Sequence, residues 1–82
     1  IQFIMPTQHD INLTFINQKG FDTSSITSLT KALHWLKTTD VDNLMYGEPS
    51  GDEFDRAVGE MRRPMLIESV EREIKRLEST KS

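Results

Sequence analysis

The chain has 82 residues, a formal net charge of −3 and no cysteine, and 35% of its residues are hydrophobic against 28% charged. This length supports one small core, and the lack of cysteine excludes a disulfide framework and a thiolate zinc site. No apolar run reaches the roughly 20 residues that cross a bilayer, so we expect a soluble protein in the cytoplasm. Residues 1–82 are predicted to form a single domain with a frayed tail over 78–82.

The N-terminal part has the pattern of a β-hairpin. Residues 1–4 form a short apolar run, and residues 11–17 alternate apolar with polar side chains, which is the period of a strand with one buried face. The apolar members of the second run are Ile11, Leu13 and Phe15. We therefore predict two antiparallel strands covered by helices. Because the first methionine is Met5, residues 1–4 belong either to the native chain or to a vector or larger protein.

A helix is predicted after this hairpin. The polar residues at 22–25 offer side-chain acceptors for the free amides of a helix start. The apolar residues that follow share one helical face: Ile26, Leu29, Leu33 and Leu36. Trp35 lies well round from that face. It either covers the core of this domain or anchors a partner, since tryptophan is enriched at binding hot spots.

Two helix starts are predicted in the middle of the chain. Residues 40–47 read as a short helical turn with Asp40 as its cap. Beyond a loop, Ser50 and Glu53 stand at the spacing of a capping box, in which each side chain satisfies a free amide at the start of the next helix. The sequence therefore places a helix start close to residue 50.

The last third of the chain carries two apolar stripes on different faces. The upstream stripe contains Phe54, Ala57, Val58, Met61 and Met65, and the downstream stripe contains Ile67, Val70, Ile74 and Leu77. At about 100° per residue, the two lie close to half a turn apart on one continuous helix. Pro64 cannot bond to the carbonyl of Glu60 and clashes with it. We therefore predict a break at Pro64, followed by an amphipathic helix that packs on this domain or on a partner.

Acidic residues gather between positions 38 and 55. That segment holds six acidic residues and no basic one: Asp40, Asp42, Glu48, Asp52, Glu53 and Asp55. Carboxylates at a helix start complement the helix dipole, which accounts for Asp52 and Glu53. It does not account for Asp40, Asp42 and Glu48, which form a patch that can steer a basic partner surface. The predicted partner-binding residues are therefore Trp35, Asp40, Asp42, Tyr46 and Glu48.

Arginines in the C-terminal half support a second hypothesis, that of a small nucleic-acid-associated regulator. The candidate contacts are Arg56, Arg62, Arg63 and Arg76. Interleaved glutamates and the negative net charge oppose it, because nucleic-acid-binding domains concentrate basic charge on one face.

Motifs for chemistry are missing from the sequence. It has no glycine-rich phosphate loop, no nucleophile elbow and no helix-borne histidine pair. Asp40, Asp42 and Asn43 resemble a calcium loop only in composition, since the glycine and the distal glutamate are not at their required positions. We therefore expect no enzymatic activity, no catalytic residue, no metal and no cofactor.

The sequence as a whole predicts an α+β domain, with an N-terminal antiparallel hairpin packed against about three helices. We expect this small acidic protein to act without chemistry by binding another protein with a basic surface, as an inhibitor, regulator, adaptor or assembly subunit. A homodimer and an oligomerisation fragment of a larger protein are left open, and no membrane partner is expected.

Overall fold

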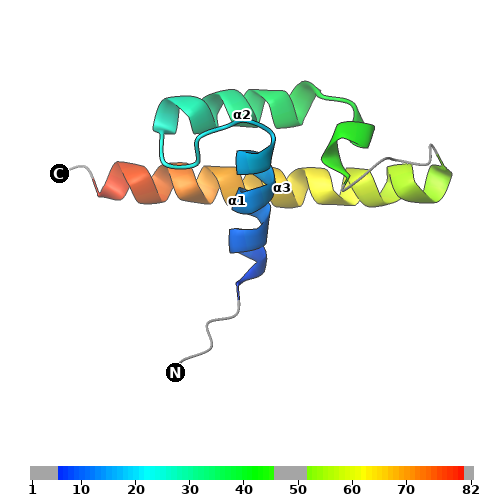
Figure 1. Cartoon of the computed structure of the whole chain (residues 1–82), viewed down its shortest axis with the longest axis horizontal. Helices are drawn as coiled ribbons and strands as arrows, with labels where there is room; N and C mark the ends of the chain where they lie inside the picture. The colour runs from blue at the N-terminus through cyan, green and yellow to red at the C-terminus, as the bar shows by residue number, and fades with distance from the viewer. Residues whose placement is uncertain (1–5, 46–51, 81–82) are drawn as a thin grey trace.

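The structure, a computed structural model, describes residues 6–45 and 52–80. These ranges contain helix α1 (Gln8–Gln18), helix α2 (Ile26–Thr38), the 3-10 helix η1 (Val41–Leu44) and helix α3 (Glu53–Ser79). Figure 1 shows α3 along the length of the molecule, α2 antiparallel beside it and α1 crossing it near its middle. Neither described range contains a strand. The protein is therefore all-α, and the predicted α+β class is wrong.

The predicted second strand is helix α1. A capping box starts it, because the Asp10 amide donates to Thr7 Oγ1 at 3.2 Å and the Thr7 amide donates to Asp10 Oδ2 at 3.2 Å. Its buried residues are Asn12, Phe15 and Ile16, which are spaced three and four apart as on a helical face. The first predicted strand, residues 1–4, lies outside the described residues.

Helix α2 confirms the helix predicted after residue 25. Ser25 is the N-cap, and its hydroxyl accepts from the Ser28 amide at 3.3 Å. Leu29, Ala32 and Leu36 are fully buried, and Leu33 packs against them. The sequence was sufficient here because the cap and the apolar period agree.

The two later helix starts are partly as predicted. Asp40 caps η1 by accepting from the Asp42 amide at 3.0 Å. The N-cap of α3 is Asp52, whose Oδ1 accepts from the Phe54 amide at 3.4 Å. Ser50, the predicted cap, lies outside the described residues. Glu53 is the first residue of α3 and not the third, so it does not complete the predicted box.

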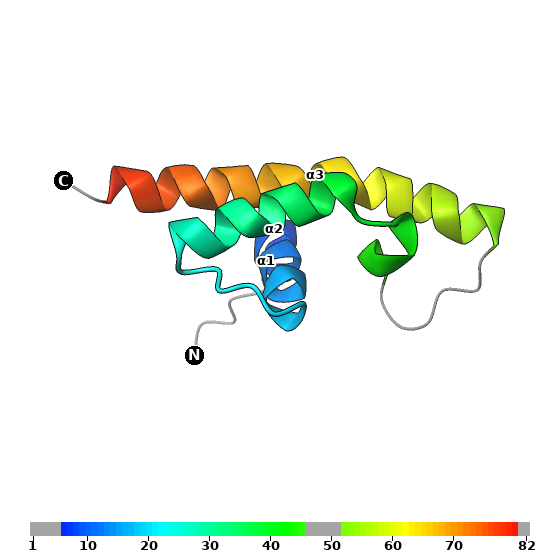
Figure 2. The same cartoon turned by 90° about the horizontal axis from the view of Figure 1, so that it is seen from above.

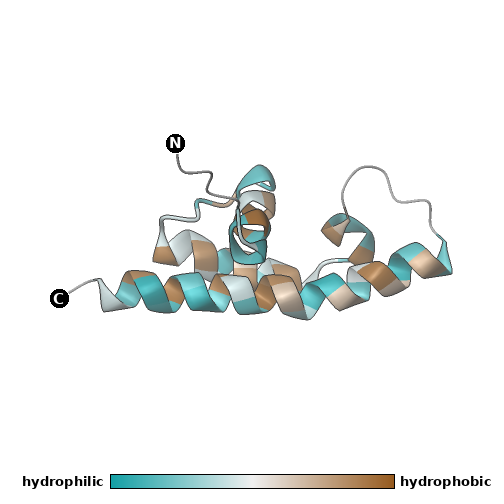
Figure 3. Ribbon diagram, turned by 90° about the horizontal axis from the view of Figure 1, so that it is seen from below, coloured by the Kyte–Doolittle hydropathy of each residue, from teal (hydrophilic) through white to brown (hydrophobic). Residues whose placement is uncertain are grey.

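The predicted break at Pro64 is wrong. Helix α3 runs for 27 residues through the proline, and Figures 2 and 3 show a gentle bend in place of a break. Two side chains just before the proline bond this part of α3 to the elements that it packs against. The Arg62 Nε donates to the carbonyl of Leu44 at 2.6 Å, and Arg63 donates to the carbonyls of Leu36 at 2.6 Å and Thr39 at 3.0 Å.

The core lies where the three helices meet. Leu66 and Val70 of α3 are buried against Leu29 and Leu36 of α2, and Phe15 and Ile16 of α1 complete the cluster. Towards its N-terminus α3 packs on η1 through Gly59, where a Cβ atom would lie 2.2 Å from Val41 Cγ2. Helices α1, α2 and η1 therefore all pack against α3.

Replacing Pro64 with alanine should stabilise the domain. The variant restores the amide that bonds to the Glu60 carbonyl, and Pro64 is exposed, so no packing is lost. We expect a gain of about 1–2 kcal/mol, below the roughly 3 kcal/mol difference between proline and alanine in a helix interior, because the bend already relieves part of the clash. Urea denaturation of both proteins measures the gain. A loss of stability would show that the bend itself is needed for packing.

Candidate functional site

An exposed apolar stripe runs along the N-terminal half of α3. Phe54 is 72% exposed, Met61 69% and Met65 45%, and Val58 is partly buried beside them. Intervals of three, four and seven residues place all four on one helical face. Figure 3 views α3 from the side away from α2 and shows apolar colour along this half of the helix. These four residues are called the α3 stripe below.

The stripe is exposed because α3 is continuous. The downstream apolar residues Ile67, Val70, Ile74 and Leu77 pack into the core. Since the two predicted stripes lie close to half a turn apart on one helix, the upstream one then faces away from α2. Between residues 53 and 63 the core-facing side of α3 carries Gly59 and two arginines instead. Helix α3 therefore contributes one face to the core and another face to the exposed stripe.

The segment of the chain that leads into the stripe and contains most of it is acidic. Residues 40–63 hold seven acidic and three basic residues, a net charge of −4. Arg56 of α3 reaches towards η1, and its Nη1 atom lies 3.7 Å from Asp42 Oδ1 and 4.0 Å from Asp40 Oδ1. Glu60 lies 3.2 Å from Arg63. The acidic rim of the stripe consists of the N-cap Asp52 together with Glu53 and Asp55 in the first turn of α3; Asp40 and Asp42 lie on the side of α3 that meets η1.

The predicted partner-binding residues have different surroundings. Asp40 and Asp42 lie beside the first turns of α3 through their contact with Arg56, which projects from the side of the helix opposite the stripe. Trp35 is partly buried, packs against the core and lies 5.6 Å from Phe21 between ring centroids. This placement agrees with the interpretation that Trp35 covers the core of its own domain. Tyr46 and Glu48 lie outside the described residues.

The four arginines of the nucleic-acid hypothesis all make intramolecular contacts. Arg62 and Arg63 donate to backbone carbonyls, and the Arg62 guanidinium lies 5.0 Å from the centre of the Phe15 ring. Arg56 is paired with Asp42 and Asp40. Arg76 is bonded to the buried Glu73, whose hydrogen bond and charge raise the pKa of Arg76. Each of these four arginines is therefore engaged by other groups of the same chain.

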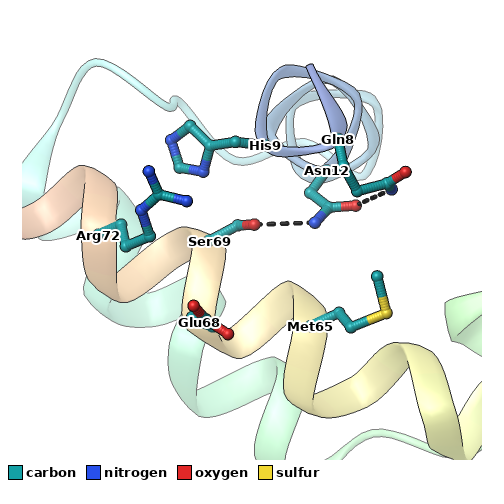
Figure 4. Close-up of a pocket in the computed structure, with 7 residues that line it drawn as sticks. All are labelled: Gln8, His9, Asn12, Met65, Glu68, Ser69 and Arg72. Carbon is teal, nitrogen blue, oxygen red and sulfur yellow. Dashed lines mark hydrogen bonds between the residues drawn. The ribbon is translucent and has the colours of Figure 1, made fainter.

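A pocket of about 170 Å³ lies where α1 crosses α3. Asn12 Nδ2 donates to Ser69 Oγ at 2.8 Å, and Gln8 Nε2 donates to Asn12 Oδ1 at 2.9 Å (Figure 4). Asn12 and Ser69 are both buried. His9 and Arg72 point towards each other above this pair of hydrogen bonds. The pocket thus has a buried polar floor, formed by Asn12 and Ser69, and an edge that carries the charge of Arg72.

Sequence reasoning found the stripe residues but not the pocket. The spacing of Phe54, Val58, Met61 and Met65 puts them on one helical face, but it does not show that this face is exposed. The pocket was not predicted because a strand over residues 11–17 does not bring its residues onto one face. Read as a helix from Thr7, the same segment places Gln8 and Asn12 on one face, four residues apart.

Some classes of site are absent from the described part of the chain. Residues 6–45 and 52–80 contain no group of three or more histidine, aspartate or glutamate residues arranged to hold a metal ion. No helix in these ranges combines the length and the apolar character needed to cross a membrane. Comparison with protein-family models, with curated proteins and with solved structures gave no match.

Proposed function

We propose that the protein is a non-catalytic protein-binding domain whose partner docks on the α3 stripe. The observation that carries this proposal is the exposure of Phe54 and Met61, 72% and 69%, on one face of a helix whose other face holds the core. Inhibitor, regulator, adaptor and assembly subunit are all roles that such a surface can serve.

Burial of the stripe would supply the binding energy. Removing a large apolar side chain from water contributes about 1.5–3 kcal/mol when burial is complete. Phe54 is the aromatic member, and the two methionines are flexible enough to adapt to different partner surfaces. A partner helix with apolar residues three and four positions apart matches the length of the stripe, because such helices dock in this way on apolar surfaces.

The acidic rim determines the charge of the partner. With a net charge of −4 over residues 40–63, the surface favours a segment whose apolar residues are flanked by lysine or arginine. A second copy of the chain would bring the same acidic rim to the interface, which favours a different protein. Because exposed charges are screened by salt, binding should weaken as ionic strength rises.

Substitution of Met61 by glutamate should abolish this binding while leaving the fold intact, because the side chain is exposed. The probe is a fluorescent synthetic helix with leucines on one face and lysines beside them. We expect Met61→Glu to bind it about tenfold more weakly than wild type or worse, a loss of at least 1.4 kcal/mol. Fluorescence anisotropy measures the affinity, and circular dichroism confirms that the variant is folded.

Two controls separate apolar docking from simple charge attraction. Thr27→Glu adds the same charge at an exposed site on α2 and should bind the probe like wild type. A peptide with glutamates in place of the lysines should bind more weakly to wild type. Equal binding of the lysine peptide by wild type and Met61→Glu would refute the proposal. A dimer in light scattering that is lost only in Met61→Glu would assign the stripe to self-association instead.

A further inference from the structure

Arg72 is oriented towards His9 although a carboxylate is available on its own helix. Glu68 lies four residues earlier, at the spacing that favours a glutamate–arginine pair on a helix. Within residues 6–45 and 52–80, however, Arg72 has no ion pair within 4.0 Å. Figure 4 shows its guanidinium pointing towards the imidazole of His9, with the Glu68 carboxylate drawn away from both.

His9 contributes a second polar group with no partner in the described structure. Its Nδ1 atom is buried and has no hydrogen bond to any described residue. A buried polar nitrogen without a partner is unfavourable and uncommon in folded proteins. The Arg72 guanidinium and the His9 ring therefore lie together on one edge of the pocket.

The rest of the pocket is built for a small ligand. Its floor is fixed, because Asn12 and Ser69 are buried and bonded to each other and Gln8 holds the other side of the Asn12 amide. Met65 supplies an apolar wall. The space of about 170 Å³ is enough for a short organic group.

We propose that this pocket binds a carboxylate. The guanidinium of Arg72 donates to the two carboxylate oxygens from its planar fork. A turn of the His9 ring brings its Nδ1–H to one of these oxygens, and the attached carbon chain lies against Met65. A monoanion fits better than a phosphate dianion, because Glu68 also lines the pocket and the protein has a net charge of −3. The pocket shares Met65 with the stripe, but its polar groups belong to residues outside the stripe.

Titration with sodium butyrate, followed by heteronuclear NMR, tests the proposal. We expect saturable shifts of the His9 ring and of the Asn12 and Gln8 side-chain amides, with a Kd on the order of 1–10 mM for so small a ligand. Butyramide, which has the same shape without the charge, should give no saturable shift.

Two charge-matched variants decide which residues act. Arg72→Gln should weaken butyrate binding about tenfold or more. Lys75→Gln removes the same charge from the next turn, where the side chain lines a different hollow with Leu33 and Ile74; it should change the Kd by less than about twofold. Non-saturable shifts, or equal losses in the two variants, would overturn the proposal. His9→Gln, which removes the ring, gives a second test, and unchanged affinity there would remove His9 from the site.

The carboxylate can belong to a free acid or to a peptide chain. A short peptide with a free C-terminus and its amidated form distinguish the two sources. Tighter binding of the free peptide than of butyrate, lost on amidation, assigns the pocket to a protein terminus; butyrate binding alone assigns it to small acids. Because Met61 does not line the pocket, Met61→Glu should bind butyrate like wild type, so a failure here is distinguishable from a failure of the stripe.

Discussion

Replacing Phe15 with alanine is expected to lower the free energy of unfolding by about 3–5 kcal/mol. Phe15 is 2% exposed and belongs to the core cluster between α1 and α3. Its ring also lies 5.0 Å from the Arg62 guanidinium and 5.2 Å from Lys19 Nζ. Because small domains have total stabilities of roughly 5–15 kcal/mol, this one change should remove a large part of the stability.

Urea denaturation followed by far-UV circular dichroism measures this loss, and Ile11→Ala is the matched control. Ile11 lies on the same helix but is 39% exposed, so its truncation should change stability by less than about 1 kcal/mol. A strand would bury both residues on one face, and the two variants would then lose similar amounts. Equal losses would therefore contradict the docking of α1 as a helix.

Replacing Gly59 with alanine is expected to destabilise the protein by about 2–3 kcal/mol, although alanine is the better helix former by about 1 kcal/mol. A Cβ atom at this position would lie 2.2 Å from Val41 Cγ2 and 3.0 Å from the Val41 carbonyl oxygen. Val41 is itself buried, and one of its two close atoms belongs to the backbone. Either η1 or α3 must therefore shift.

A double-mutant cycle with Val41→Ala separates this clash from other effects. Removing the Val41 methyl groups relieves the shortest contact, so the double variant should lose less than the sum of the single variants by about 1 kcal/mol or more. Ala57→Gly, at an exposed position of the same helix, should destabilise by about 1 kcal/mol through helix propensity alone. Stabilisation by Gly59→Ala would show that η1 does not approach α3 this closely.

The consequence of the continuous α3 is that a single helix carries both the fold and the proposed interface. Ile67, Val70, Ile74 and Leu77 pack in the core, whereas Phe54 and Met61 of the α3 stripe are largely exposed. Substitutions in the stripe should therefore affect binding without affecting stability, which makes the two properties separable by experiment.

Several features of the protein were determined by local sequence. Helix α2 follows from a Ser25 cap and an apolar period that agree with each other, and the cap of η1 follows from Asp40. The positions of the two stripes, and their offset around α3, follow from residue spacing alone. The acidic segment is also visible in the sequence. In each case the deciding interactions are within a few residues of one another.

Tertiary contacts decided the rest. In α1, Ile11, Leu13 and Phe15 fit the period of a strand, but the burial of Asn12 and Ile16 selects the helix. The capping box that starts it is a local signal between Thr7 and Asp10. The Asn12–Ser69 hydrogen bond that forms the pocket floor joins residues 57 positions apart, so no local pattern reveals it.

The path of α3 through Pro64 was decided in the same way. Proline removes one hydrogen bond locally and clashes with the preceding turn. Arg62 and Arg63 offset this by bonding to carbonyls 18, 27 and 24 residues away, and the core holds the segment beyond the proline. Short-range sequence rules include the destabilising effect of the proline but not these distant bonds. The continuity of α3, and with it the exposure of the α3 stripe, is therefore seen only in the folded structure.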